Sequence, residues 1–215
     1  MATVSSREAS SVSQFDRWSH SYESGIWSRY FSQSYDAVIE SSKKSIKKST
    51  FNVVDVGCGT GLFLQRFSNK IPGVNALTGI DLSKEMIKIA RNKKYTAKKI
   101  VFSVESSSSM SLETSEYDVV FCLNALHHFP DHREVFKEFS RILRAGGTLI
   151  LLELFTDGLA RKSWLPIMKK IFNERDVEFH NRKELIALGK SANFSLIDGK
   201  NYGYFSALNI YEAAK

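Results

Sequence analysis

The spacing of apolar residues along the chain changes several times, and each change predicts a new element. Short apolar runs, rich in β-branched and aromatic residues, predict buried strands at residues 51–56, 76–81, 99–104, 117–123 and 148–154. Apolar residues spaced three or four apart predict helices between these strands, at residues 61–69, 83–93 and 131–144. Strands that alternate with helices favour a doubly wound α/β domain, in which helices cover both faces of a mainly parallel sheet.

The segments on either side of this alternating core have a looser pattern. Residues 1–13 are rich in serine, and we predict a disordered tail there. Aromatic residues recur at helical spacing over residues 14–42, which predicts one or two amphipathic helices. Beyond residue 154 the pattern predicts helices at residues 159–172 and 182–192 and strands at residues 194–197 and 208–213. We expect Ser83 to cap one core helix and Gly146 and Gly147 to end another.

Composition narrows the class of protein. With 215 residues, 43% hydrophobic and 25% charged, the chain fits one globular domain over residues 14–215. Two cysteines without metal-ligand spacing indicate neither a disulfide framework nor a metal site, and they favour a reducing, cytoplasmic location. No apolar run approaches the roughly 20 residues of a membrane span. The net charge of +7 is gathered in clusters that either bind an anionic partner or are simply solvated; we favour solvation.

A glycine-rich run follows the first predicted strand and opens a helix. It reads V-D-V-G-C-G-T-G over residues 54–61, and its glycines let the backbone turn tightly and approach a ligand closely. Leu62 stands where a dinucleotide-binding loop needs its third glycine, and the Gly-Lys-Ser/Thr of a phosphate-binding loop is absent. A purely structural turn is the alternative interpretation.

An acidic residue closes the second predicted strand. The Asp81 carboxylate is placed to accept hydrogen bonds from both hydroxyls of a ribose, which favours an adenosine ligand without a 2′-phosphate. Asp81 also precedes a helix, where a carboxylate is favoured by the helix dipole alone. The two roles are compatible, and we favour ribose binding.

In their order along the chain, several motifs resemble those of the class I S-adenosylmethionine-dependent methyltransferases. They are the glycine run, G-I-D-L-S with Met86, then Y-D-V-V, L-H-H and L-R-A-G-G. Near the N-terminus, F-D-R-W followed by S-Y-E resembles a segment of quinone-type and other small-molecule members, although Ser19 and Glu23 depart from its usual Ala and Asp. The resemblance implies a Rossmann-like sheet of seven strands in the order 3-2-1-4-5-7-6, with the last strand antiparallel.

The resemblance also implies roles for matching residues toward S-adenosylmethionine and its product S-adenosylhomocysteine. Asp55 would organise the glycine loop, and Asp118 would be structural. The methionine portion and ribose would lie along Gly57, Cys58, Gly59 and Asp81. The adenine would lie against Leu82, Met86, Glu105 and Ser106, with Glu105 departing from the family's usual Asp, and Asn124 would pass beneath the cofactor.

Three further features concern the methyl acceptor. His127 and His128 follow the fourth strand, and either could act as a general base, or the pair could simply form a packed turn. In the implied group, residues 14–42 form a lid whose Tyr22 would contact the cofactor or cap the pocket. Residues 155–194 form an insertion that would shape the acceptor site, with apolar candidates Trp164, Leu165, Ile167, Met168, Ile171 and Phe172.

The function favoured by the sequence is therefore methyl transfer to a small molecule whose identity the sequence leaves open. An RNA or protein methyltransferase would use the basic clusters, but the segment after the fourth strand lacks the N/D-P-P-Y motif of amino-directed base methylation. A non-catalytic subunit would have no need of both the glycine loop and Asp81. A nicotinamide oxidoreductase is disfavoured by Leu62.

Overall fold

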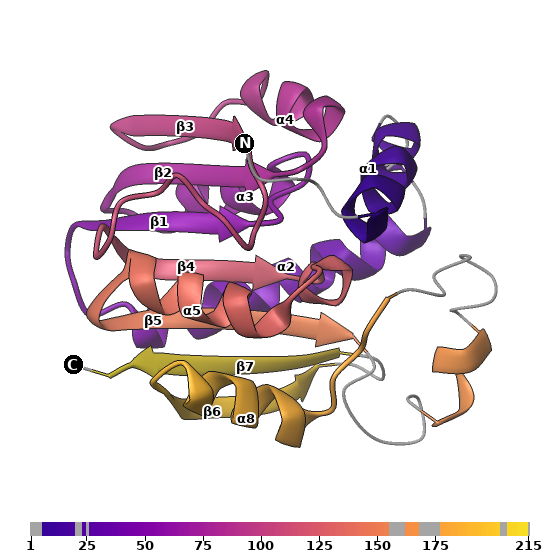
Figure 1. The fold of residues 1–215 in the computed structure, drawn as a ribbon. Coiled ribbons are helices and arrows are strands. Elements are labelled where there is room, and N and C mark those ends of the chain that lie inside the picture. The colour runs from indigo at the N-terminus through magenta and orange to yellow at the C-terminus, as the bar shows by residue number, and fades with distance from the viewer. Residues whose placement is uncertain are drawn as a thin grey trace.

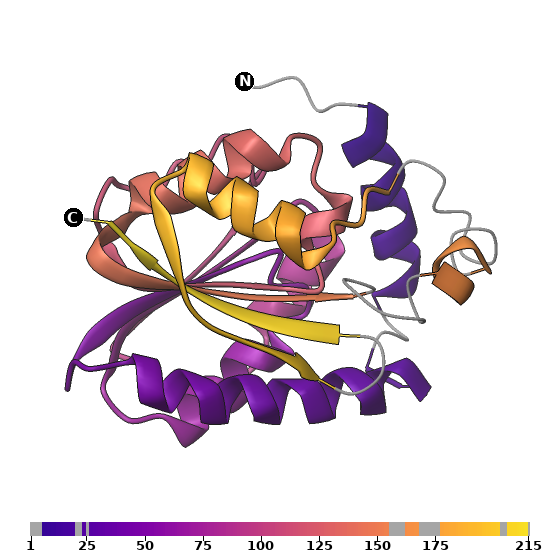
Figure 2. The same cartoon turned by 90° about the horizontal axis from the view of Figure 1, so that it is seen from below.

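The computed structural model describes residues 6–19, 23–24, 26–154, 162–167, 177–202 and 206–214. A twisted sheet forms its centre, with helices packed on both faces (Figures 1 and 2). The strands are β1 (Phe51–Val56), β2 (Val74–Asp81), β3 (Lys99–Val104), β4 (Tyr117–Leu123), β5 (Leu143–Leu154), β6 (Phe194–Tyr202) and β7 (Ser206–Ala213). The helices are α1 (Ser6–Trp18), α2 (Ile26–Ser45), α3 (Leu62–Lys70), α4 (Lys84–Arg91), the short η1 (Leu126–His128), α5 (His132–Ile142) and α8 (Arg182–Ser191).

The seven strands lie in the order β3-β2-β1-β4-β5-β7-β6, which confirms the order that the motifs implied. Strands β1 to β5 pair in parallel, and β7 runs antiparallel between β5 and β6. The strand order reverses direction between β1 and β4. In an open parallel sheet, that reversal leaves a crevice at the carboxyl ends of the strands.

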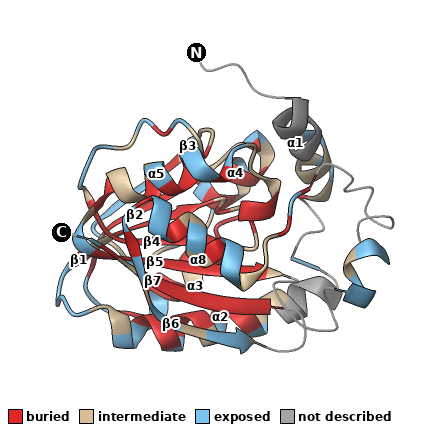
Figure 3. Ribbon diagram, turned by 60° about the horizontal axis from the view of Figure 1, so that its bottom comes forward, coloured by how far each residue is buried: buried red, intermediate tan, exposed pale blue. Residues whose placement is uncertain are grey.

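Alternation of side chains along the central strands divides the core into two layers. One layer joins Val53, Leu77 and Phe121 to the helices α2, α3 and α4. The other joins Val54, Val56 and Val120, among others, to the helices α5 and α8. The central strands are therefore buried on both faces (Figure 3), which explains their continuous apolar sequence.

Three predicted boundaries were wrong for identifiable reasons. Helix α1 begins at Ser6, inside the predicted disordered tail, and it presents Val12 and Phe15, three residues apart, to one cavity. Helix α5 ends at Ile142 rather than after residue 144, because Leu143 is buried and pairs with Tyr117 as part of β5. Gly146 is therefore not a helix cap: its φ of 71° lies in an irregular stretch of β5.

No helix in the described part of the chain is long and apolar enough to cross a membrane. Of the N-terminal segment predicted as a lid, α2 packs against α3 and β5 and contributes Tyr35, Val38 and Ile39 to the core. Helix α1 lies beyond the carboxyl ends of the strands (Figure 1).

Asp118 joins three parts of the fold at the start of β4, consistent with the structural role implied for it. Its carboxylate accepts hydrogen bonds from Lys48 Nζ (2.5 Å), the backbone N–H of Asn52 (2.9 Å) and Arg144 Nη1 (2.6 Å). Burial alone would raise the pKa of Asp118, but these donors together hold the pKa below its ordinary value.

We expect Asp118→Asn to lower the free energy of unfolding by about 2 kcal/mol at pH 7, because it weakens several charge-assisted hydrogen bonds. The folded-state pKa lies below the unfolded value of about 3.9, so the carboxylate stabilises the fold above that pH. This contribution is lost as the pH falls through the folded-state pKa. Urea unfolding at pH 7 and at about pH 3 measures the change. The difference in free energy of unfolding between the wild type and the variant should be smaller at the lower pH.

Asp36→Asn is the matched control, because the Asp36–Lys70 pair is 51% exposed at both side chains. A surface pair of this kind contributes less than about 1 kcal/mol. Equal losses for the two variants would contradict the role assigned to Asp118.

Candidate functional site

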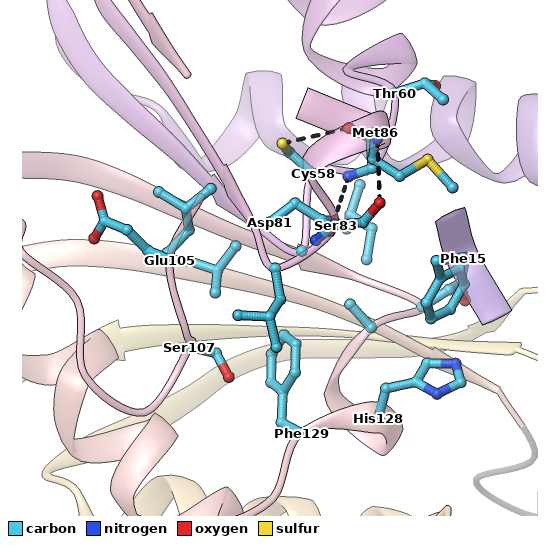
Figure 4. Close-up of a pocket in the computed structure, with 18 of the residues that line it drawn as sticks. Phe15, Cys58, Thr60, Asp81, Ser83, Met86, Glu105, Ser107, His128 and Phe129 are labelled. Atoms are coloured by element: carbon cyan, nitrogen blue, oxygen red, sulfur yellow. Dashed lines mark hydrogen bonds between the residues drawn. The ribbon is translucent and has the colours of Figure 1, made fainter. Parts of the chain in front are cut away.

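One cavity lies at the carboxyl ends of β1, β2 and β4, beneath α1 (Figure 4). Most of the residues that the sequence singled out for cofactor binding line it, although they come from separate loops. Those residues are Gly57, Cys58, Gly59, Asp81, Leu82, Met86, Glu105, Asn124 and His128.

The glycine loop holds two backbone conformations that a side chain would oppose. Gly57 has a φ of 80°, and a Cβ there would come within 2.5 Å of the Ala125 Cβ. Gly59 has a φ of 52°, but a Cβ there would meet nothing within 4 Å. Glycine is therefore required at position 57, because a side chain there would collide with the loop that follows β4. At position 59 the missing side chain leaves open space on the wall of the cavity.

Asp81 ties the glycine loop to the start of α4. Its Oδ2 accepts a hydrogen bond from the backbone N–H of Gly59 at 2.9 Å, and its Oδ1 accepts one from the N–H of Ser83 at 2.9 Å. Burial raises the pKa of Asp81 despite these two donors. Each carboxylate oxygen has a second acceptor position, so both atoms retain capacity for hydroxyl donors in the cavity.

Ser83 connects α4 to the N-terminal helix. Its hydroxyl caps α4 by accepting from the Met86 backbone N–H at 3.1 Å, as predicted, and donates to Asp16 Oδ1 at 2.5 Å. Asp16 lies in the last turn of α1. Its neighbour Phe15 packs edge-on against the His128 ring, and the two ring centroids lie 4.8 Å apart. Helix α1 is thus fixed to both sides of the cavity.

The segment after β3 departs from the sequence interpretation. Glu105 borders the cavity, but its carboxylate points away from Asp81 (Figure 4) and accepts from the Ser111 backbone N–H at 2.8 Å. Ser107, rather than the predicted Ser106, lines the wall. The loop turns back through hydrogen bonds between Ser106 and Ser108, a local geometry that the serine run alone does not specify.

The two histidines after β4 have different surroundings, although their ring centroids lie only 4.3 Å apart. His128 lines the cavity, whereas His127 does not: its Nδ1 lies 2.9 Å from Glu153 Oε2, and its ring stacks on Phe179 at 4.5 Å. Burial raises the pKa of Glu153 to about 8. The predicted alternative of a packed turn therefore describes His127, while His128 keeps access to a ligand.

Asn124 has a positive φ of 53° and lines the cavity just after β4. Both polar atoms of its side chain are buried, and among the described residues neither has a hydrogen-bond partner. A buried amide in this state needs a partner. The cavity is where such a partner would lie.

Burial raises the pKa of two predicted residues, Asp55 beneath the glycine loop and Cys58 within it. Asp55 is buried beneath the glycine loop, and burial, followed by repulsion from Asp81, raises its pKa well above the ordinary value. The same causes, in the same order, raise the pKa of the Cys58 thiol. Cys58 is therefore a wall of the cavity rather than a thiolate nucleophile.

The sequence analysis missed some residues of the cavity, and four of its predicted residues lie outside the described part of the chain. Tyr22 lies outside the described residues, as do Met168, Ile171 and Phe172. Trp164 and Ile167 are about half exposed, and Leu165 packs against a small cluster of Val177 and Phe179. Sequence reasoning gave no cavity role to Val12, Tyr35, Ser107 or Phe129, which line it. Only the apolar spacing in α1 carried a signal.

Comparisons with known proteins agree with this architecture. Residues 54–151 match the family described as "Methyltransferase domain". A demethylmenaquinone methyltransferase of Oceanobacillus iheyensis is 26% identical, over 88% of this chain and 92% of its own length. Among other curated relatives, a Methanocaldococcus jannaschii protein that is 27% identical matches over 82% of its length, and several more match over 37% to 50%.

Solved structures extend the likeness over nearly the whole chain. A Haloferax volcanii methyltransferase complex with the Trm112 activator aligns with a TM-score of 0.78 at 18% identity, covering 94% of this chain and 98% of that one. The magnesium protoporphyrin IX methyltransferase of Synechocystis, solved with bound S-adenosylhomocysteine, aligns with a TM-score of 0.72 at 20% identity over 97% of both chains. At these identities the structures bear on the fold. The family match over residues 54–151, together with the ordered motifs, identifies a class I S-adenosylmethionine-dependent methyltransferase domain in this chain, and the solved structures agree with it in fold.

Proposed function

We propose that the cavity holds S-adenosylmethionine with its ribose on Asp81 and its methionine end along the glycine loop. The observation that carries this proposal is the pair of hydrogen bonds from Gly59 and Ser83 to the Asp81 carboxylate. They hold the carboxylate beside the loop, with acceptor positions left for two ribose hydroxyls.

Two further observations support the fit of the cofactor. The Asn124 amide is buried and lacks a partner among the described residues, and the cofactor's polar groups would supply one. Leu82 and the almost fully buried Met86 offer an apolar wall for the adenine. The Glu105 carboxylate is engaged with Ser111, so we assign the adenine edge to the neighbouring loop residue Ser107.

The reaction requires alignment more than covalent help from the protein. The bound cofactor supplies a methyl group on a sulfonium, which leaves as a neutral thioether when an acceptor atom attacks the methyl carbon in line. The protein's part is to orient the two partners and exclude water. Where the acceptor arrives protonated, His128 accepts its proton, because it lines the cavity on the side of Phe15 and Phe129.

We propose a small molecule as the methyl acceptor. Support comes from the relative that acts on demethylmenaquinone, which this chain matches over most of both lengths. Support also comes from the aromatic side chains of Phe15 and Phe129 on the cavity wall beside His128. Flat, apolar acceptors pack well against such faces.

The structure weakens the argument for a nucleic-acid acceptor that the basic clusters gave, because several of their lysines form ion pairs. Lys43 pairs with Glu40, Lys48 with Asp118, and Lys93 with Glu23. Lysines engaged in this way contribute less to an electrostatic footprint for phosphates.

The same proposal covers the organisation of the chain. Residues 14–215 form one methyltransferase domain, α1 acts as the lid together with the segment that contains Tyr22, and residues 155–194 shape the acceptor side. Both cysteines are free and buried, which supports a reducing, cytoplasmic setting.

Asp81→Asn should weaken S-adenosylhomocysteine binding about 100-fold, because it removes the charge that accepts the ribose hydroxyls. Isothermal titration calorimetry measures the affinity, and circular dichroism checks the fold. Glu105→Gln is the control, since that carboxylate faces Ser111, and its affinity should change less than about threefold. If both variants lost affinity for S-adenosylhomocysteine equally, the assignment of Asp81 to the ribose would be wrong.

Methyl transfer is tested directly with S-adenosylmethionine labelled in the methyl group. The acceptors are demethylmenaquinone with a short side chain, a panel of phenols, amines and carboxylic acids, and bulk transfer RNA. We expect label in the small-molecule fraction, because the cavity wall beside His128 is apolar and aromatic. Label found only in RNA would overturn the choice of acceptor class, and thermal stabilisation by NADH rather than by S-adenosylmethionine would overturn the cofactor.

On the identified acceptor, His128→Ala should lower kcat by about 100-fold with little change in KM. The wild-type rate should rise with pH as the base loses its proton, and the variant should lose that rise. Added imidazole should restore part of the rate. Undiminished turnover of the variant would show that His128 serves only as packing for Phe15.

A further inference from the structure

Three side chains from distant parts of the sequence converge outside the cofactor cavity. His132 begins α5, and its Nδ1 lies 2.5 Å from Nε2 of His180, which is 48 positions further along the chain. The Glu178 carboxylate lies 3.9 Å from each of these two nitrogens. One potential ligand atom from each residue lies within 4.8 Å of the others.

The local sequence explains why these groups face one another. Residues 177–180 alternate as Val, Glu, Phe and His in a stretch without helix, so alternate side chains point to opposite sides. Val177 and Phe179 are buried in an apolar cluster, which directs Glu178 and His180 to the other side. There they meet His132, whose position is set by the start of α5 and the Asp131 cap.

We propose that His132, Glu178 and His180 bind a zinc ion. Two imidazole nitrogens and one carboxylate oxygen are a donor set that zinc accepts, with the fourth position of a tetrahedral site left to water. Bonds of about 2.0–2.1 Å to each ligand would set the donor atoms roughly 3.3 Å apart. The two nitrogens, 2.5 Å apart, need to separate by about 0.8 Å, and a single Glu178 oxygen, within 4.8 Å of both, needs to approach them by up to about 1.5 Å.

The surroundings of the three residues fit a metal site. The His132 side chain is only 4% exposed and that of His180 13%, while the Glu178 side chain, at 59%, leaves solvent access for the ion. The other ring nitrogen of His180, Nδ1, lies 3.5 Å from Glu184 Oε2. A carboxylate behind a ligating histidine fixes its ring orientation and raises its basicity.

The ion would join the chain before α8 to the connection between β4 and α5. The two segments already touch, since the Glu178 backbone N–H donates to the His127 carbonyl at 3.2 Å and Phe179 stacks on the His127 ring. Helices α5 and α8 lie side by side on one face of the sheet (Figures 1 and 2). The zinc would thus clamp the end of the 155–194 insertion against the turn that carries His128.

The test uses the full chain, freed of metal by a chelator and titrated with zinc chloride in a calorimeter. We expect one zinc per chain, and at a hundredfold excess of zinc over its Kd, Tm should rise on the order of 5 °C. Cobalt(II) in the same site should give the visible absorption of a four-coordinate ion. His180→Gln and Glu178→Gln should each weaken zinc binding at least 10-fold and abolish the cobalt band.

Glu134→Gln is the matched control for Glu178→Gln. Glu134 is also an exposed glutamate of this region, at 50%, but it pairs with Lys137. Its variant should bind zinc as the wild type does. Because Glu178 is exposed, its substitution leaves the apolar packing intact, so loss of zinc cannot be ascribed to unfolding.

A wild-type chain that binds no zinc would overturn the proposal, and so would binding that survives both His180→Gln and Glu178→Gln. In either case the two histidines form a metal-free hydrogen-bonded pair. These measurements need no S-adenosylmethionine, so failure here leaves the proposed methyl transfer standing, and failure of methyl transfer leaves the zinc site standing.

Discussion

The Asp81 carboxylate is the interaction on which the site depends. It receives backbone N–H groups from the glycine loop of β1 and from the first turn before α4, so two adjacent strand ends become one rigid rim. Such an arrangement is possible because parallel strands end at the same edge of the sheet. Ser83 then extends the rim to α1 through Asp16, which makes the N-terminal helix part of the cavity rather than an appendage.

The residues that follow β4 form the other wall of the cavity. Asn124 turns with a positive φ, and the short helix η1 then divides two adjacent histidines between different environments. His127 is held by Glu153 inside the protein, and His128 is left on the cavity wall against Phe15. A single turn of chain thereby packs one histidine inside the protein and leaves the other on the wall of the cavity.

The proposed acceptor side is built by contacts between distant segments. Residues 177–180 dock on η1 through a backbone hydrogen bond and an aromatic stack, and the proposed zinc site lies on the outer side of the same contact. The family match ends at residue 151, within β5, so residues 177–180 lie outside the part of the chain that it covers. A clamp at this point would fix the acceptor wall without touching the cofactor.

The sequence by itself determined the alternation of strands and helices, the glycine loop and Asp81, because these depend on local periodicity and on motifs of fixed spacing. The strand order followed from the family resemblance that those motifs carry. The sequence could not determine that the Glu105 side chain points away from the cavity or that Ser107, rather than Ser106, lines the wall. Nor could it determine that His127 and His128 have different surroundings. Each of these outcomes depends on which neighbour a side chain meets. Only the tertiary structure brought His132 to His180, for the two are 48 residues apart and share no sequence motif. Burial likewise decided where α5 ends, because Leu143 gains more by pairing with Tyr117 in the sheet than by another turn of helix.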